Sequence, residues 1–228
     1  MKSIIFFAFN EEKLIYRSIS NIIKLFKKKF EIIVVNDGSK DKTLQEIKKI
    51  QNQFSDIVVI DKKKNEGIAS AVYSGIEKSK FEYVSWLPSD GAYSENKLID
   101  FYEKSKLDGT DLIIGFRNNK KSRSFYRYFL SEFLTFVLNL IFNEKIKDYN
   151  GVIIVNKNNL DLINLPVHPS FQWIIIVQLL KKKIKYKQIP IEMRIPEPGD
   201  GSSALNLKTF TSYFISLIKL IKIVFFKL

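Results

Sequence analysis

Short apolar runs alternate with apolar residues at helical spacing through the first half of the chain. The runs of strand length lie at 4–9, 32–35, 57–60 and 83–87. The stretches with helical spacing lie between them, at 14–26, 44–54 and 68–76. This alternation is typical of a parallel sheet that helices cover on both faces. The pattern therefore predicts an α/β fold with a mostly parallel sheet flanked by helices.

The second half predicts a strand at 112–115, a long apolar helix at 125–142, a strand at 151–155 and a helix at 171–180. We see no internal repeat and no linker. We therefore expect one domain over residues 1–205, with halves of about 1–115 and 116–205. From residue 206 to 228 we expect a separate amphipathic helix, because its Lys and its Phe and Ile side chains fall on opposite faces. The apolar helix at 125–142 and this terminal helix suit either a membrane interface or an ordinary core.

Polar clusters follow the predicted strands of the first half. They lie at 10–12, 36–39, 65–67 and 89–91. In parallel sheets of this kind, ligands bind beyond the carboxyl ends of the strands. The clusters therefore predict a ligand site at that edge of the sheet.

The amino-acid composition excludes several kinds of active site and metal site. The chain of 228 residues has no Cys and one His, His168, which excludes a disulfide framework, thiol catalysis and metal sites built from several His. The formal charge is +13, yet only five of the 37 basic residues are Arg, and three of these lie between 117 and 127. The Lys excess can reflect compositional bias, and the sequence has no nucleic-acid-binding motif. We therefore expect no nucleic-acid partner, and a compositional bias towards Lys does not explain the clustered Arg.

No targeting or spanning segment is expected from the pattern. The apolar start of the chain stops at Asn10, too early for a signal peptide. Uncharged runs also stay shorter than the roughly 18 to 20 residues of a spanning helix.

Four motifs occur in order along the first half. They are Phe9-Asn10-Glu11-Glu12, Val35-Asn36-Asp37-Gly38-Ser39-Lys40-Asp41-Lys42-Thr43, Asn65-Glu66-Gly67-Ile68-Ala69-Ser70-Ala71 and Leu87-Pro88-Ser89-Asp90-Gly91. From the residues, Gly38 permits a tight turn and Ser39 can cap the following helix. The set closely resembles the family-two glycosyltransferases of the GT-A (Rossmann-like) fold over residues 3–203. Within them it is most similar to dolichyl-phosphate mannose synthase and other polyprenyl-phosphate glycosyltransferases.

The resemblance implies a site for a nucleotide diphosphate sugar in the half 1–115. The residues it implies for this site are Ala8, Asn10, Glu11, Asp37, Gly67 and Asp90. It also implies that Asp90 is catalytic and holds a divalent cation, Mg²⁺ or Mn²⁺, on the diphosphate. Pro88 and Ala92 depart from the family metal motif, because polar or acidic ligands are expected at both positions. A single carboxylate with phosphate oxygens can still hold Mg²⁺, which keeps several waters.

The resemblance also implies an acceptor site in the half 116–205. Arg117, Arg127, Ser131 and Arg194 would bind the acceptor phosphate, and Arg127 and Ser131 share one face of a helix. Asp148 would orient the acceptor or act as a catalytic base, and a structural role in a turn is an equal alternative. An acceptor phosphate is already anionic at neutral pH, so it needs no base, whereas a sugar hydroxyl does.

The expectation that follows is an inverting glycosyltransferase that moves a sugar from a nucleotide diphosphate sugar to a polyprenyl phosphate. It would lie on the cytoplasmic side of a membrane, peripheral or anchored at the interface. Two alternatives stay open. One is a glycosyltransferase with a hydroxyl acceptor in surface polysaccharide assembly, and the other is a catalytically impaired nucleotide-sugar binding protein.

Overall fold

The computed structural model describes residues 1–26, 29–119, 125–161 and 171–194, together with Ile215 and Ile218. The side chains of 125–127 and 161 are not described. His168, the loop at 196–203 and the predicted C-terminal helix, apart from Ile215 and Ile218, lie outside the described residues.

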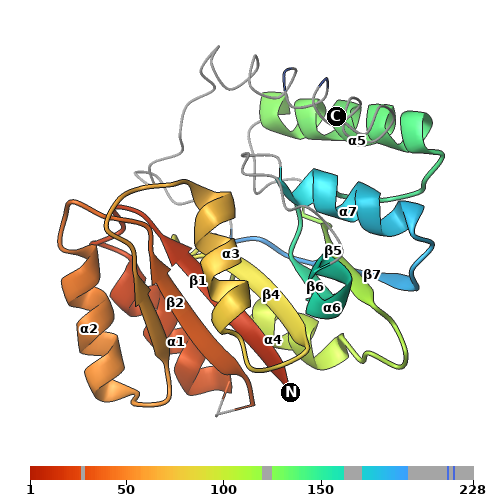
Figure 1. Ribbon diagram of the computed structural model, residues 1–228. Coiled ribbons are helices and arrows are strands. Elements are labelled where there is room, and N and C mark those ends of the chain that lie inside the picture. Colours follow the sequence, from red (N-terminus) through yellow and green to blue (C-terminus); the bar gives the residue numbers. More distant parts are fainter. Residues whose placement is uncertain (27–28, 120–124, 162–170, 195–214, 216–217, 219–228) are drawn as a thin grey trace.

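One seven-stranded sheet organises the described chain, with the strand order β3-β2-β1-β4-β6-β5-β7 (Figure 1). The strands are β1 (Lys2–Ala8), β2 (Glu31–Asn36), β3 (Val58–Asp61), β4 (Tyr83–Pro88), β5 (Leu112–Arg117), β6 (Ile153–Asn156) and β7 (Tyr186–Ile191). Strands β1 to β4 pair in parallel, β6 pairs antiparallel with β4 and β5, and β5 pairs in parallel with β7. The expected α/β fold with a mostly parallel sheet is confirmed.

Helices cover both faces of the sheet. They are α1 (Ile15–Phe26), α2 (Thr43–Gln53), α3 (Ile68–Lys78), α4 (Glu95–Lys104), α5 (Phe125–Phe142), α6 (Lys157–Asp161) and α7 (Phe171–Lys181). Helices α1, α2 and α4 pack on one face, and α3, α6 and α7 pack on the other. The side chains of β1 alternate between the two faces. Ile4 and Phe6 belong to the core cluster on the side of α1, α2 and α4, and Ile5 belongs to the cluster on the side of α3, α6 and α7.

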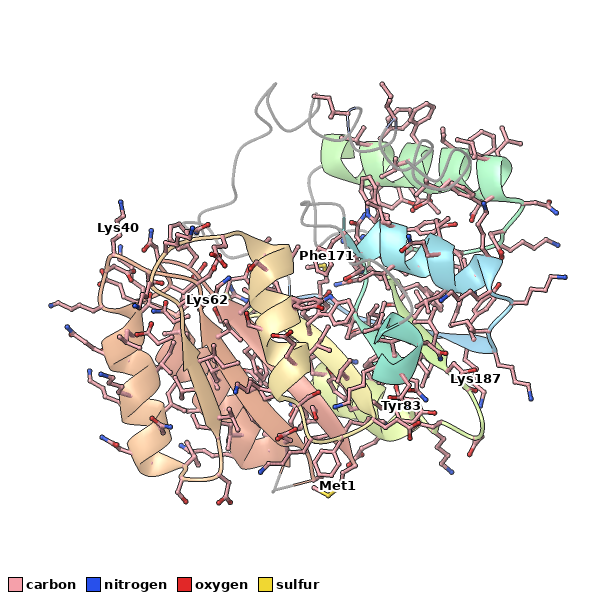
Figure 2. The ribbon with its side chains drawn as sticks, viewed as in Figure 1. Met1, Lys40, Lys62, Tyr83, Phe171 and Lys187 are labelled. Atoms are coloured by element: carbon pink, nitrogen blue, oxygen red, sulfur yellow. The ribbon has the colours of Figure 1, made fainter. Side chains whose placement is uncertain are left out.

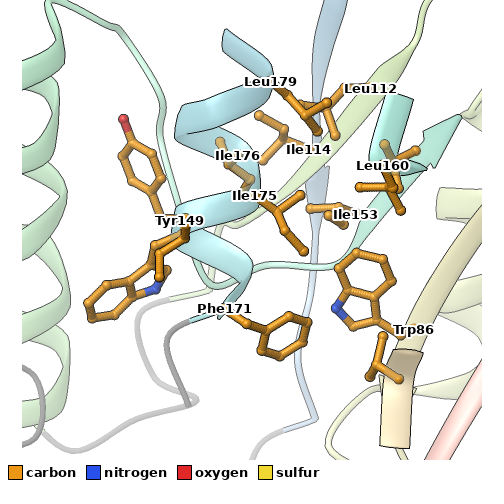
Figure 3. Close-up of a cluster of buried hydrophobic side chains, with 14 of the residues drawn as sticks. Trp86, Leu112, Ile114, Tyr149, Ile153, Leu160, Phe171, Ile175, Ile176 and Leu179 are labelled. Atoms are coloured by element: carbon orange, nitrogen blue, oxygen red, sulfur yellow. The ribbon is translucent and has the colours of Figure 1, made fainter. Parts of the chain in front are cut away.

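The apolar core on the α3 side of the sheet continues beneath α7 in the second half (Figure 3). The ring of Trp86 on β4 lies 5.7 Å from that of Phe171, and its Nε1 donates a hydrogen bond of 3.0 Å to Gln172 Oε1. Helix α5 lies beyond α7, farther from the sheet, and contributes Leu134 and Leu138 to this cluster (Figures 1 and 3). These contacts join the two halves of the sheet into one packed body.

Three described elements were not expected from the sequence: α4, the short α6 and β7. The strand predicted at 151–155 begins at Ile153 and runs against its neighbours. Periodicity cannot give strand direction, because a buried strand reads the same in either direction. None of the described helices has both the length and the apolar character needed to cross a membrane.

Candidate functional site

A cleft of about 470 Å³ opens at the carboxyl ends of β1, β2 and β4, beside the first turn of α3. This is the edge at which the sequence predicts a ligand site. The residues that line it are Phe7, Phe9, Glu11, Asp37, Asn65, Glu66, Gly67, Ile68, Ala69, Ser89 and Asp90.

Glycine brings two loops of the cleft together. Gly38 follows β2 with φ of +68°, and a Cβ atom placed there would lie 2.3 Å from the backbone carbonyl carbon of Lys64. No side chain fits in that space, so the turn after β2 packs directly on the loop after β3. The cleft wall therefore depends on the absence of a side chain at Gly38.

Asp37 is buried at the base of this wall and accepts hydrogen bonds from the opposite loop. Its Oδ1 accepts from the backbone N–H of Glu66 at 3.1 Å, and its Oδ2 accepts from that of Gly67 at 2.8 Å. The Nζ of Lys62 lies 3.2 Å from Oδ1. Asp37 thus fixes the start of α3 relative to β2, a role that the sequence motif did not indicate.

The loop after β1 is held by the side chains that follow β2. The backbone N–H of Asn10 donates to Ser39 Oγ at 3.0 Å, and that of Glu11 donates to Thr43 Oγ1 at 2.7 Å. Asn10 Oδ1 accepts from the backbone N–H of Lys40 at 2.9 Å. Ser39 therefore anchors the neighbouring loop instead of capping α2 as the sequence predicted. Helix α2 begins later, at Thr43, whose N–H donates to Asp41 Oδ1 at 2.9 Å.

Glu11 and Asp90 place two carboxylates on the cleft. Desolvation raises the pKa of Glu11, and the negative charges of Asp90 and Asp41 raise it further. Desolvation also raises the pKa of Asp90, against the opposing effects of a 2.9 Å hydrogen bond from the Ala92 N–H and the charge of Arg194. This side of the cleft therefore carries negative charge that a cation would stabilise.

The carboxylate of Asp90 is accessible at the cleft and suits one divalent cation completed by phosphate oxygens and water. Among the described residues, no group of three or more His, Cys, Asp or Glu is arranged to hold a metal ion without such help. Pro88 and Ala92 offer no side-chain ligand. One carboxylate therefore suits a metal ion that binds together with a phosphate-containing ligand better than a metal ion held by the protein alone.

The segment after β7 reaches the loop that carries Asp90. Tyr93 and Met193 form an isolated antiparallel bridge, and the backbone N–H of Arg194 donates to Ala92 O at 3.0 Å. The Nε of Arg194 donates to Gly91 O at 3.2 Å. A guanidinium from the second half thus lies beside the Asp90 loop.

Arg117 and Asp148 form a buried ion pair outside the cleft. Nε of Arg117 donates to Asp148 Oδ2, and Nη2 donates to Oδ1 at 2.5 Å. Asp148 also accepts hydrogen bonds from the backbone N–H groups of Arg117 and Asn150. Each side chain is less than a tenth exposed, so the pair closes the end of β5 on the turn before β6.

The residues predicted for the site separate into groups. Glu11, Asp37, Gly67 and Asp90 line the cleft, whereas Ala8 is buried beneath it at the end of β1. Those that lie apart from the cleft lining are Asn10, Arg117, Ser131, Asp148 and Arg194. The side chain of Arg127 lies outside the described residues, and the roles of all these residues stay predictions.

Several lining residues were missed as individual candidates: Phe7, Phe9, Asn65, Glu66, Ile68, Ala69 and Ser89. Most fall inside the motifs quoted above. The signal that could have found them is position, because residues at a strand end and in the first turn of the next helix face the same edge.

Solved structures with the same architecture define the class. A mannosyltransferase from Pyrobaculum calidifontis, solved in complex with GDP-Man and Mn²⁺, superimposes with a TM-score of 0.68 over 96% of this chain and 64% of its own, at 14% identity. The fold is therefore the GT-A fold of glycosyltransferases.

Sequence relatives make the assignment more specific. An uncharacterized glycosyltransferase of Rickettsia typhi is 38% identical over 128 residues, which are 54% of this chain and 39% of that protein. A poly-β-1,6-N-acetyl-D-glucosamine synthase of Staphylococcus aureus is 34% identical over 101 residues, 44% of this chain and 24% of the synthase. The family model for glycosyl transferase family 2 matches residues 3–182. The chain belongs to this family, and it spans well under half the length of these two relatives.

Proposed function

We propose that the protein transfers a sugar from a nucleotide diphosphate sugar to a polyprenyl phosphate, with inversion at the anomeric carbon. The observation that carries the donor half of this proposal is the cleft at the carboxyl ends of β1, β2 and β4, which brings Asp37, Gly67 and Asp90 together. Membership of glycosyl transferase family 2 supports the same reading.

Donor binding uses both walls of the cleft. Glu11 and Asp37 belong to the loops that would surround the base and ribose, and Phe9, which is 42% exposed, offers them an aromatic face. Gly67 precedes α3, and a Cβ atom placed on it would meet no atom within 4 Å. The diphosphate can therefore approach the backbone there, close to the positive end of the helix dipole.

Asp90 would hold Mg²⁺ or Mn²⁺ against the diphosphate. A bound metal would stabilise the negative charge that gathers on the leaving nucleoside diphosphate. The solved structure of the Pyrobaculum mannosyltransferase is a complex with GDP-Man and Mn²⁺, which supports this assignment. Arg194 lies beside the same loop and would add positive charge to it.

The acceptor is proposed to be an anionic lipid phosphate. Its oxygen would attack the anomeric carbon as the bond from that carbon to the diphosphate oxygen breaks, and no base is required. Arg117, Arg127, Ser131 and Arg194 are the proposed phosphate ligands. Arg117 already donates through Nε and Nη2 to Asp148, so its other N–H groups would serve the phosphate. Asp148 then acts by orienting Arg117.

An apolar stripe on α5 supports a membrane partner. It consists of Phe129, Phe133, Phe136 and Leu140, which are 56% to 73% exposed and spaced by three or four residues on one side of the helix. Exposed aromatic stripes of this kind suit a lipid interface. A peripheral position on a membrane would place the protein beside a prenyl lipid.

The proposal is tested by incubating the protein and Mg²⁺ or Mn²⁺ with labelled UDP and GDP sugars and a polyprenyl phosphate. Label should enter the lipid fraction with one of the donors through a phosphodiester linkage. If no donor labels the lipid while the donors bind, the acceptor assignment is wrong.

A hydroxyl acceptor in surface polysaccharide assembly is the second candidate. The match to the staphylococcal poly-β-1,6-N-acetyl-D-glucosamine synthase favours it. This reaction would yield a glycosidic linkage, stable to the mild acid that cleaves a sugar phosphodiester, so the product linkage separates the two candidates.

A nucleotide-sugar binding protein with impaired catalysis is the third candidate. Pro88 and Ala92 motivate it, because neither side chain can ligate a metal. Saturable donor binding with no transfer to either class of acceptor would support this candidate against the other two.

A further inference from the structure

Lys62 is a nearly buried cation directly after β3, beside the cleft but absent from its lining (Figure 2). Its side chain is 11% exposed. Its Nζ lies 2.7 Å from Glu66 Oε2 and 3.2 Å from Asp37 Oδ1, and it donates to Ser70 Oγ at 2.7 Å. Lys62 therefore joins the end of β2 to the loop and first turn of α3.

The contacts of Lys62 differ from those of its neighbours along the chain. Lys63 is exposed, and the Nζ of Lys64, whose side chain is 79% exposed, lies 3.7 Å from Glu66 Oε1. The backbone N–H of Lys62 also donates to Asn36 O at 2.9 Å. This bond extends the pairing of β2 with β3 and fixes the base of the Lys62 side chain.

The network around Lys62 contains two carboxylates that both line the cleft. Asp37 is buried and Glu66 lies at the rim of the cleft, and both carboxylates contact the ammonium group of Lys62. Hydrogen bonds from Lys62 and Ser70 hold the pKa of Glu66 below its ordinary value. Without the ammonium group, two negative charges would face each other, and a buried carboxylate that loses its cation is strongly destabilised.

The same network fixes backbone groups at the donor site. Asp37 accepts the N–H groups of Glu66 and Gly67, and Gly67 immediately precedes α3. If Asp37 and Glu66 moved apart, Gly67 and the first turn of α3 would move with them. A displacement of about 1 Å in a binding site is enough to cost up to about a hundredfold in function.

We propose that Lys62 is a positioning residue, which holds Asp37 and the loop 65–67 in the arrangement that binds the nucleotide part of the donor. The inference rests on the proposed donor site and adds to it a residue that contacts the site's carboxylates without lining the cleft. Lys62 acts through Asp37 and Glu66 and contacts neither sugar nor metal.

The test compares Lys62→Met with Lys63→Met, a matched control that removes the adjacent exposed charge. Hydrogen exchange of the unliganded proteins reports the amides of Glu66 and Gly67. Calorimetric titration with UDP-glucose and GDP-mannose in the presence of Mg²⁺ reports donor affinity. Lys62→Met should accelerate exchange at both amides and weaken binding of the preferred donor about ten- to a hundredfold. Lys63→Met should resemble the wild type in both measurements.

Two further variants separate positioning from general destabilisation. Lys62→Arg keeps a cation and should recover most of the affinity. Lys62→Met combined with Glu66→Gln removes the facing negative charge and should bind the donor more tightly than Lys62→Met alone. Urea denaturation of the same variants distinguishes the two effects, because a loss of affinity that merely followed the free energy of unfolding across the series would contradict the positioning role.

The possible failures are distinguishable. If the wild type binds a donor and Lys62→Met binds it equally well, the positioning role is wrong and the donor site stands. Weakened binding that neither Lys62→Arg nor the double variant improves also contradicts the positioning role. If the wild type binds none of the donors, the proposed donor site fails, and the inference fails with it.

Discussion

The two halves of the sheet use buried carboxylates differently. Asp37 in the first half and Asp148 in the second are both buried, accept backbone N–H groups and contact a cation. The neighbours of Asp37 open onto a cleft, whereas Asp148 and its partner Arg117 lie apart from the cleft lining. The same chemistry thus forms one wall of a cleft in the first half. In the second half it forms a buried joint, from which Arg117 is proposed to reach the acceptor phosphate with its remaining N–H groups.

This difference follows from the strands. In the first half, parallel β1, β2 and β4 bring three loops to one edge, and their polar groups bind one another's backbone around an open space. In the second half, antiparallel β6 is placed between β4 and β5, so the turn before it returns to the end of β5. The cleft proposed for the donor is therefore preformed, whereas the second half is built mainly on the apolar core beneath α7.

The largest expected effect tests the donor side. Asp90→Asn removes the carboxylate charge that would hold the metal and should lower sugar transfer about 10²- to 10³-fold. The matched control is Asp100→Asn, an exposed change on α4 that should leave transfer unchanged. Initial rates with the preferred donor give the comparison. Equal rates for wild type and Asp90→Asn would remove Asp90 from the catalytic machinery.

The joint in the second half predicts a loss of stability. Arg117→Met leaves Asp148 buried without its cation and should lower the free energy of unfolding by about 3 kcal/mol. Urea denaturation measures the loss, and donor affinity should stay within about twofold of wild type, since the pair lies outside the cleft lining. A variant of unchanged stability would show that the ion pair is not structural, and the account of this half would be wrong.

Close to the Arg117–Asp148 pair, the backbone of Gly151 packs against that of Gly115 on β5, which gives a second test of rigidity in this half. A Cβ atom placed on Gly151 would lie 1.6 Å from Gly115 O, and neither group can move without shifting β5. Gly151→Ala should lower the free energy of unfolding by about 2 kcal/mol, as overpacking in a core does. Thermal unfolding checks this. An unchanged midpoint would mean that the end of β5 is more adaptable than the packing indicates.

The smallest effect on stability is expected on the apolar stripe of α5. Phe133→Ser should change the free energy of unfolding by less than about 0.5 kcal/mol, because the side chain is 56% exposed. It should nevertheless reduce cosedimentation with anionic phospholipid vesicles. Tyr73→Ser, an equivalent change on α3 at a side chain that is 45% exposed, is the control. Equal cosedimentation of all three proteins would argue against the stripe as a membrane contact.

Much of the first half could be predicted from sequence because its signals are local. Runs such as Ile32–Val35 gave the strands, and the polar clusters after them gave the edge where the cleft lies. The motifs identified Glu11, Asp37, Gly67 and Asp90, which all line the cleft.

The parts of the fold and of the site that the sequence did not predict depend on contacts between residues far apart in the chain. Nothing local indicates that Arg117 meets Asp148, that Ser39 anchors Asn10 or that Lys62 reaches Asp37. Such contacts follow from strand order and direction, which alternation of apolar residues does not specify. The polar strand β7 was missed for a related reason, since its side chains are mostly half-buried or exposed and include Pro190.

The most direct test of the account is hydrogen exchange of the protein with and without its preferred nucleotide sugar and Mg²⁺. The account predicts protection at residues 9–12, 65–70 and 89–92, with little change in α5 or in the turn that contains Asp148. Protection confined to the second half, with none around the cleft, would contradict the donor site and the comparison built on it.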